Sequence, residues 1–147
     1  RSARMFPRAV SDIIITGRAA GATRRQVLTT VLRPYESGMR GPDVHLGDHA
    51  ISSMALIFHE LATNASKYGA LSAESGRVEL SWSLDGEDLS ITWNEIGGPA
   101  VSEPASEGFG SSLVRSTVSR HNGHVTWRWL PDGMIVSIAV AAATLLQ

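Results

Sequence analysis

Apolar and polar residues follow helical spacing in some parts of the 147-residue chain and strict alternation in others. Between residues 51 and 68, apolar side chains recur on one face at about 100° per residue, which predicts a long helix. The same spacing, over fewer residues, predicts helices at 22–35 and 111–121. Gly69 follows the longest pattern and is expected to end that helix.

Alternation of apolar and polar residues marks two further segments, 78–93 and 125–140. Each is interrupted near its middle by turn residues, Asp85-Gly86 in the first and Pro131-Asp132-Gly133 in the second. An alternating run on both sides of such a turn is typical of a β-hairpin. The sequence therefore predicts two hairpins.

The remaining segments are less regular. Residues 37–47 predict a turn around a short strand that contains Val44 and Leu46, and residues 96–107 predict a loop long enough to suggest a function. The order is helix, strand, helix, hairpin, loop, helix and hairpin. We therefore expect an α/β fold, a two-layer α/β sandwich whose helices pack on one face of a mixed, largely antiparallel sheet.

Composition and charge narrow the function. The chain has 43% hydrophobic residues and a formal net charge of −1, which fits one compact domain and gives no attraction to nucleic acid. It has no cysteine, which excludes disulfides and thiolate sites, and no apolar run long enough to span a bilayer. We expect one compact domain at 21–147, compatible with the cytoplasm and without direct membrane contact, preceded at 1–20 by a linker or the remnant of an upstream helical region.

One face of the 51–68 helix carries a carboxylate, a carboxamide and an ammonium group, from Glu60, Asn64 and Lys67. The spacing of these residues places them on the face opposite the apolar stripe. Such a set could bind a magnesium nucleotide, with the amide oxygen on the metal, the ammonium group on phosphate and the carboxylate as proton acceptor. The alternative interpretation is an ordinary solvated helix face.

Two glycine-containing segments could complete such a site. Glu95 lies at the end of an expected strand and is followed by Gly97 and Gly98, so its carboxylate could accept a hydrogen bond from an adenine amino group. Gly108 and Gly110 open the expected 111–121 helix, whose free N–H groups could hold phosphate. Taken alone, each segment fits an ordinary turn or a simple helix entry better than a nucleotide site.

Four of the histidines and the tryptophans are expected to have structural roles rather than catalytic or metal-binding ones. Four histidines lack the spacing of metal ligands and are expected on the surface or in loops: His45, His49, His121 and His124. Trp82 and Trp93 are expected in the core, whereas Trp127 and Trp129 share one face of the last hairpin and suit either the core or a contact surface.

Over residues 22–140 these motifs resemble a known family. The run from His59 to Leu71 resembles the N-box of HWE histidine kinases, within the wider GHKL group of ATPases and kinases. Residues 93–95 (Trp-Asn-Glu) resemble its Trp-x-Glu motif, and residues 96–99 and 108–110 resemble its two glycine boxes.

The resemblance implies ATP and Mg²⁺ as cofactors, Asn64 as the metal ligand, and a catalytic set of Glu60, Asn64 and Lys67. It also implies that Glu95 reads the adenine. The ATP-binding set that it implies consists of His59, Asn64, Lys67, Tyr68, Glu95, Gly97, Gly98, Gly108, Phe109, Gly110, Ser111 and Leu113.

The function so implied is that of the ATP-binding catalytic domain of a two-component sensor histidine kinase. Such a domain delivers the γ-phosphoryl group to a histidine on its own upstream phosphoacceptor helical domain, and the group then passes to a response-regulator receiver domain. Two alternatives stay open: another GHKL ATPase or protein-serine kinase, and a nucleotide-sensing docking module without turnover.

Overall fold

The computed structural model describes residues 39–40, 46–99 and 109–146 of the chain. The predictions made for residues 1–38, for Val44, His45 and Gly108, and for most of the 96–107 loop lie outside these ranges. Five strands form one sheet in the order β1-β2-β3-β5-β4. Their bounds are Met39–Arg40 for β1, Arg77–Asp85 for β2, Asp88–Ile96 for β3, His124–Leu130 for β4 and Gly133–Ala141 for β5.

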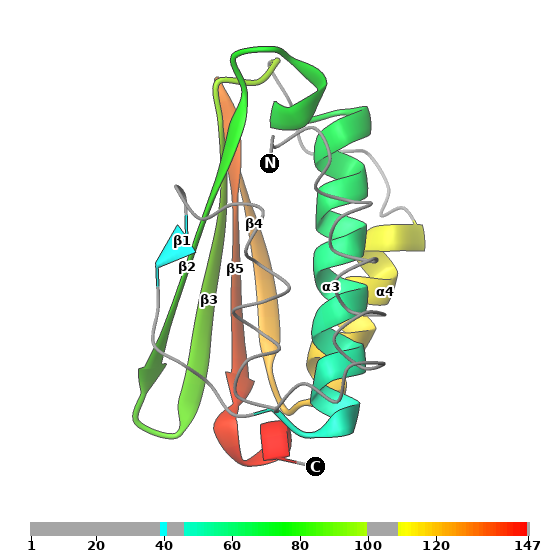
Figure 1. Cartoon of the computed structure of the whole chain (residues 1–147), viewed down its shortest axis with the longest axis vertical. Coiled ribbons are helices and arrows are strands. Elements are labelled where there is room, and N and C mark those ends of the chain that lie inside the picture. Colours follow the sequence, from blue (N-terminus) through cyan, green and yellow to red (C-terminus); the bar gives the residue numbers. More distant parts are fainter. Residues whose placement is uncertain (1–38, 41–45, 100–108, 147) are drawn as a thin grey trace, which may run out of the picture.

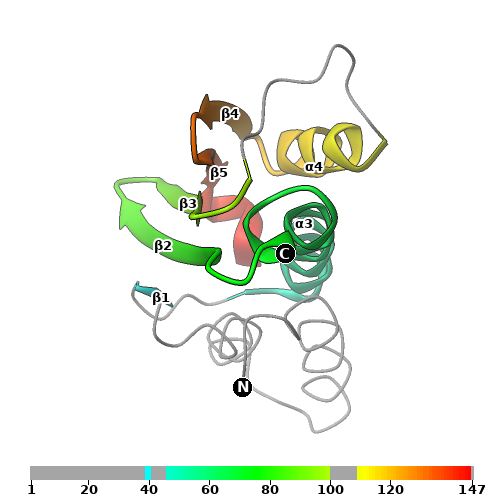
Figure 2. The same cartoon turned by 90° about the horizontal axis from the view of Figure 1, so that it is seen from above.

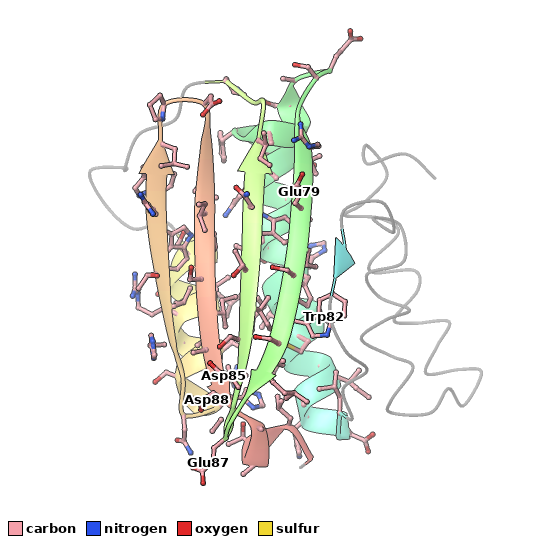
Figure 3. All side chains as sticks on the ribbon, turned by 90° about the vertical axis from the view of Figure 1, so that its left-hand side faces the viewer. Glu79, Trp82, Asp85, Glu87 and Asp88 are labelled. Atoms are coloured by element: carbon pink, nitrogen blue, oxygen red, sulfur yellow. The ribbon has the colours of Figure 1, made fainter. Side chains whose placement is uncertain are left out.

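The predicted architecture is confirmed. β1 runs parallel to β2, and every other neighbouring pair is antiparallel, so the sheet is mixed and largely antiparallel. The helices α3 (Asp48–Lys67) and α4 (Phe109–Arg120) lie side by side against one face of this sheet (Figures 1 and 2). The opposite face carries no helix from the described part of the chain and exposes side chains such as Glu79 (Figure 3).

Helix α3 forms where its apolar stripe predicts it and packs that stripe on the sheet. The buried residues of α3 are Ala50, Ile51, Met54, Ile57, Phe58, Leu61, Ala62 and Ala65. The ring of Phe58 stacks on that of Trp93 from β3, with 6.3 Å between the ring centroids. The last hydrogen bonds at the end of the helix run from the N–H groups of Tyr68 and Gly69 to the carbonyls of Asn64 and Ala65. A short 3₁₀ helix, η3 (Ala70–Ser72), follows it.

Both predicted hairpins are confirmed, and the first one positions a functional group. Gly86 adopts a φ of +65° in the β2–β3 turn, a conformation that favours glycine. In β3 every second residue is buried on the face toward the helices: Leu89, Ile91, Trp93 and Glu95. The alternation thus directs the carboxylate of Glu95 to the core side of the sheet.

Two expectations for the connecting segments were wrong, and one further element was not predicted. Leu46 is not in a strand; it is fully buried directly before α3, and the only strand described in 39–47 is β1. Gly133 belongs to β5 because it pairs with both Ile96 and Leu130. The C-terminal residues, which showed no clear periodicity, form the 3₁₀ helix η4 (Ala142–Leu146).

The predictions for the aromatic and histidine residues had mixed outcomes. Trp82 and Trp93 are core residues as expected, and Trp127 and Trp129 are half-buried against the core. His121 is not a surface histidine: it is 6% exposed and hydrogen-bonded through both ring nitrogens. No helix in the described ranges is long and apolar enough to cross a membrane.

Candidate functional site

The carboxylate of Glu95 is the most deeply buried acidic group in the described part of the chain. The residue is 3% exposed. Its Oε1 accepts a hydrogen bond from the backbone N–H of Ala70 at 3.0 Å, and its Oε2 accepts one from the indole Nε1–H of Trp93, also at 3.0 Å. Each carboxylate oxygen can accept two hydrogen bonds, so one position on each oxygen remains for a ligand.

The electrostatic setting of Glu95 is unfavourable for a charge. Burial raises the pKa of the Glu95 carboxyl from its usual 4.5, and the hydrogen bonds from Ala70 and Trp93 only partly oppose this rise. Both partners are neutral, and within the described ranges Glu95 forms no ion pair. A buried carboxylate without a cation weakens a fold. Its presence therefore indicates a function other than stability.

Close backbone contacts surround this carboxylate. A Cβ atom placed on Gly69 would lie 2.0 Å from Glu95 Oε1, and one placed on Gly98 would lie 2.6 Å from the Cα of Ala70. Gly97 has a φ of +76°, which side chains rarely adopt. The segment Gly97–Gly98 after β3 therefore packs against the segment Gly69–Ala70 after α3. Backbone without side chains borders Glu95, which would allow a flat ring to approach it.

A second polar group lies where the start of α4 meets the flank of α3. A Cβ atom on Gly110 would lie 2.7 Å from Glu60 Oε2 and 3.8 Å from Asn64 Nδ2. The structure thus brings together Glu60, Asn64 and Gly110, which are far apart in sequence. Glu60 and Asn64 are half-buried on the side of α3 that α4 covers, rather than opposite the apolar stripe as expected. The first N–H groups of α4 have no partner within their helix and carry the positive end of its dipole.

The other predicted site residues are not joined to these groups by a described contact. Lys67 and Tyr68 are exposed at the end of α3, the latter by 68%. His59 is exposed and lies one position from Glu60, a rotation of about 100° around the helix. Ser111 and Leu113 are half-buried in α4. Gly108 and the side chain of Phe109 lie outside the described part of the structure.

Two contributors to the site were missed by sequence reasoning. Trp93 was expected in the core and within the Trp-x-Glu resemblance, but without a contact of its own, yet its indole N–H donates a hydrogen bond to Glu95. Ala70 was only part of the N-box run, yet its backbone N–H bonds to a residue 25 positions away. The alternation of β3 could have indicated Trp93, because residues 93 and 95 share a face. No local pattern indicates the contact with Ala70.

Metal binding from the protein alone is not indicated. Within the described residues no three or more His, Asp or Glu side chains form a group that could hold a metal ion. Magnesium characteristically takes one or two protein ligands together with substrate phosphates. Asn64, beside the start of α4, offers one such oxygen ligand.

Comparison with known proteins gives consistent sequence matches. The chain is 37% identical over 123 residues to blue-light-activated histidine kinase 1 of Erythrobacter litoralis, covering 78% of the chain and 34% of that protein. It is 36% identical over 138 residues to the blue-light-activated histidine kinase of Brucella anthropi, covering 86% and 28%. The chain thus spans about a third of the length of these curated relatives. No family model matches it.

Solved structures give the same result. The histidine kinase domain of the Erythrobacter litoralis EL346 blue-light-activated kinase superposes with a TM-score of 0.62 at 25% identity, over 74% of the chain and 53% of that structure. The catalytic domain of the histidine kinase ThkA superposes with a TM-score of 0.59 at 13% identity, over 82% and 94%, which shows the shared fold. Sequence and fold together show that the chain belongs to the HWE histidine kinase family, as a catalytic domain of the GHKL type.

Proposed function

We propose that this domain binds Mg-ATP and presents the γ-phosphoryl group to a histidine on a separate helical domain. The observation that carries the proposal is the buried carboxylate of Glu95, which has two fixed N–H donors and an open acceptor position on each oxygen. An ionised carboxylate can only accept hydrogen bonds, so it would select a ligand edge that donates, such as the adenine amino group.

The phosphates would lie at the start of α4. There the N–H groups of the first turn and the helix dipole favour an anion, and glycine at position 110 leaves room beside Glu60 and Asn64. The amide oxygen of Asn64 would bind Mg²⁺ together with the phosphates, and the bound metal would neutralise phosphate charge. Lys67, exposed one turn further along α3, would reach the phosphates with its flexible side chain.

Glu60 is the candidate proton acceptor. Its Oε2 lies beside Gly110, where the phosphates are placed, and no charged partner holds it among the residues described. A carboxylate in this position could accept a proton from, or orient, the attacking group as the phosphorus–oxygen bond forms. Most of the rate enhancement would come from positioning and charge neutralisation.

The partners follow from the same proposal. The phosphoryl group would pass to a histidine on the kinase's own upstream helical domain and from there to a response-regulator receiver domain, in the cytoplasm. A serine kinase built on the same fold would instead give an acid-stable product. Acid lability of the phosphorylated product, formed with a supplied phosphoacceptor domain, would separate the two.

Titration calorimetry with Mg-ATP tests the site itself. We expect the chain to bind, Glu95→Ala and Asn64→Ala to lose affinity, and two control variants to bind normally. The controls carry the same changes on the opposite face of the sheet: Glu79→Ala and Asn94→Ala, at residues that pair with each other across β2 and β3. Equal affinity in all five proteins would refute the assignment of Glu95 and Asn64.

A further inference from the structure

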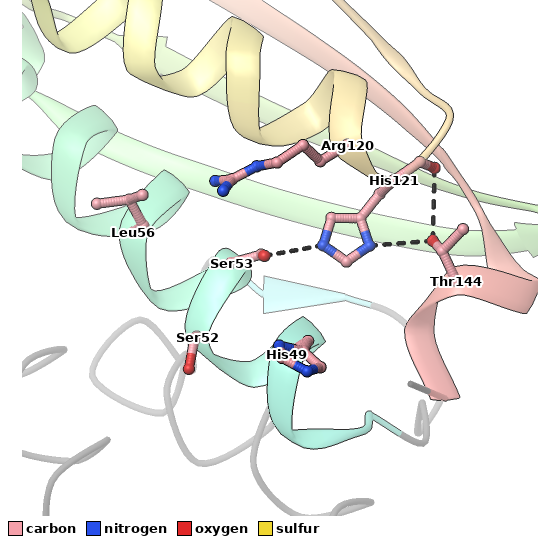
Figure 4. Close-up of a pocket in the computed structure, with 7 residues that line it drawn as sticks. All are labelled: His49, Ser52, Ser53, Leu56, Arg120, His121 and Thr144. Carbon is pink, nitrogen blue, oxygen red and sulfur yellow. Dashed lines mark hydrogen bonds between the residues drawn. The ribbon is translucent and has the colours of Figure 1, made fainter.

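A second polar cavity lies at the end of α3 opposite the candidate nucleotide site. Its volume is about 330 Å³, at the lower end of the range for small-molecule pockets. It lies where the start of α3, the end of α4 and η4 meet (Figures 1 and 4). The polar residues that line it are His49, Ser52 and Ser53 from α3, Arg120 at the end of α4, His121 in the turn after it, and Thr144 from η4.

The wall of this cavity is held by the buried ring of His121. Its Nδ1 lies 3.0 Å from Thr144 Oγ1, and its Nε2 lies 2.8 Å from Ser53 Oγ (Figure 4). The hydroxyl of Thr144 lies 2.7 Å from the carbonyl oxygen of Ala141 and 3.4 Å from that of His121, so its single hydrogen has a backbone acceptor. With that hydrogen on a carbonyl, Thr144 accepts a hydrogen bond from His121 Nδ1–H, and Nε2 accepts one from the Ser53 hydroxyl. This pattern favours a neutral ring with its proton on Nδ1.

The described residues that line the cavity carry charge of one sign. Arg120 donates a hydrogen bond to Thr117 Oγ1 at 3.2 Å and forms no ion pair among the described residues. None of the described residues that line the cavity is acidic. The ring of His49 adds a second potential donor from the first turn of α3, and the hydroxyl of Ser52 a third. A cavity with a guanidinium group and several donors, but no carboxylate, is complementary to an anion.

We propose that this cavity is a binding site for a small oxyanion, a phosphate or carboxylate group held by Arg120 with His49 and the hydroxyls of Ser52 and Ser53. The guanidinium fork suits two oxygens of such a group. The proposal does not rest on the nucleotide site, because the two sites use different residues at opposite ends of α3 (Figure 1).

Binding would be linked to a proton through His121. Without an anion, burial lowers the pKa of the His121 ring, and the charges of Arg120 and His49 lower it further. η4 contributes no titratable group, and Asp48, beside His49, does not line the cavity. A bound anion would offset these charges and favour a protonated ring. The new Nε2–H would then donate to Ser53 Oγ, which frees the Ser53 hydroxyl to donate to the anion.

The test is a titration of the whole chain with inorganic phosphate and, separately, with citrate, followed through the imidazole resonances of His121. We expect saturable shifts, tighter binding as the pH falls, and a rise in the pKa of His121. Arg120→Gln should weaken binding by about tenfold, the loss of one charge-assisted contact. Arg115→Gln is the matched control on the same helix, since the Arg115 guanidinium lies over the ring of Trp127, 5.0 Å from its centroid.

Two further variants separate the alternatives. Ser53→Ala should weaken binding, because it removes one of the proposed donors, and should remove most of the pH dependence, because no hydroxyl remains to be released. Asn64→Ala should leave the His121 shifts unchanged, whatever it does to ATP binding. The tighter ligand of phosphate and citrate would identify the class of oxyanion. The proposal is overturned if neither anion shifts His121 at millimolar concentration, or if Arg115→Gln weakens binding as much as Arg120→Gln.

Discussion

Glu95→Gln should separate ligand binding from folding. Glutamine keeps the size of the side chain but has one acceptor oxygen, so it can accept from either Ala70 N–H or Trp93 Nε1–H, while its NH₂ group faces the other donor. The buried charge is removed at the same time. Because burial raises the pKa of the Glu95 carboxyl despite both hydrogen bonds, the surroundings already favour the neutral form. The removed charge stabilises the fold and the donor left facing the NH₂ group destabilises it, so we expect the free energy of unfolding at neutral pH to change little.

ATP affinity, in contrast, should fall. A hydrogen bond to a charged group contributes about 1.5–3 kcal/mol, so losing the carboxylate should weaken binding roughly tenfold to a hundredfold. Urea unfolding gives the stability, and titration calorimetry gives the affinity. Glu79→Gln, on the exposed face of β2, is the control for a lost charge. A destabilised Glu95→Gln protein with unchanged ATP affinity would refute the reasoning, since the carboxylate would then serve the fold and not a ligand.

The pH dependence of the unmodified chain supplies an independent check on Glu95. Its pKa in the folded state is raised above 4.5, so the folded state binds the proton more tightly than the unfolded state does. This contribution to stability is complete below 4.5 and is lost as the pH rises through the folded-state pKa. ATP affinity should show the opposite slope and fall on acidification, because protonation removes an acceptor. Glu95→Gln should lack both slopes.

Three further substitutions test other parts of the structure. Gly110→Ala places a methyl group against the Glu60 carboxylate, which can move aside, so the free energy of unfolding should hardly change. The affinity for ATP in calorimetry should fall by about tenfold, because the methyl group displaces a phosphate contact. An unchanged affinity would show that no phosphate binds beside Gly110. Trp93→Phe removes the indole N–H and part of a buried ring, which should lower the free energy of unfolding by about 2–4 kcal/mol and move the acid limit of ATP binding to higher pH, because Glu95 loses a stabilising donor. The unmodified chain should lose stability in thermal unfolding as the pH falls below 6.5, because the folded state lowers the pKa of His121 and resists its protonation. His121→Asn should abolish this loss of stability. If the loss persists in the variant, another group causes it.

Local sequence patterns account for most of the fold. Helix α3 and the strands of both hairpins each bury one face against the core. Burial of one face requires apolar residues at the period of the element, so the pattern reveals both its type and its position. Leu46 shows the limit: two apolar residues at alternate positions, Val44 and Leu46, are too few to define a period, and the burial of Leu46 depends on contacts from elsewhere. The C-terminal η4 was missed for the same reason.

The candidate site was only partly predictable, for a related reason. Glu60 and Asn64 share a helix flank by spacing alone, and the pleat of β3 directs Glu95 inward. The contacts that make these residues a site come from distant segments: Ala70 reaches Glu95 across 25 positions, and Ser53 reaches His121 across 68. Such contacts depend on how the helices dock on the sheet, which no local period encodes. His121 was expected on the surface or in a loop because the histidines lack ligand-like spacing; it does lie in the turn after α4, but it is buried there.

The topology also favours one orientation of a bound nucleotide. β3 and α3 both end at the same edge of the two-layer sandwich, and α4 begins below that edge, beside Glu60 and Asn64 of α3 (Figure 1). The start of α4 carries roughly half a positive elementary charge from its dipole, which attracts phosphate. The carboxylate of Glu95 would repel phosphate, and the repulsion would be strong because burial leaves little water to screen it. A nucleotide bound the other way round would therefore place anion against anion and leave the first turn of α4 without a partner. The base would lie at Glu95 and the phosphates at Gly110, so a triphosphate without a base should compete with ATP at α4 and leave the Trp93–Glu95 hydrogen bond undisturbed.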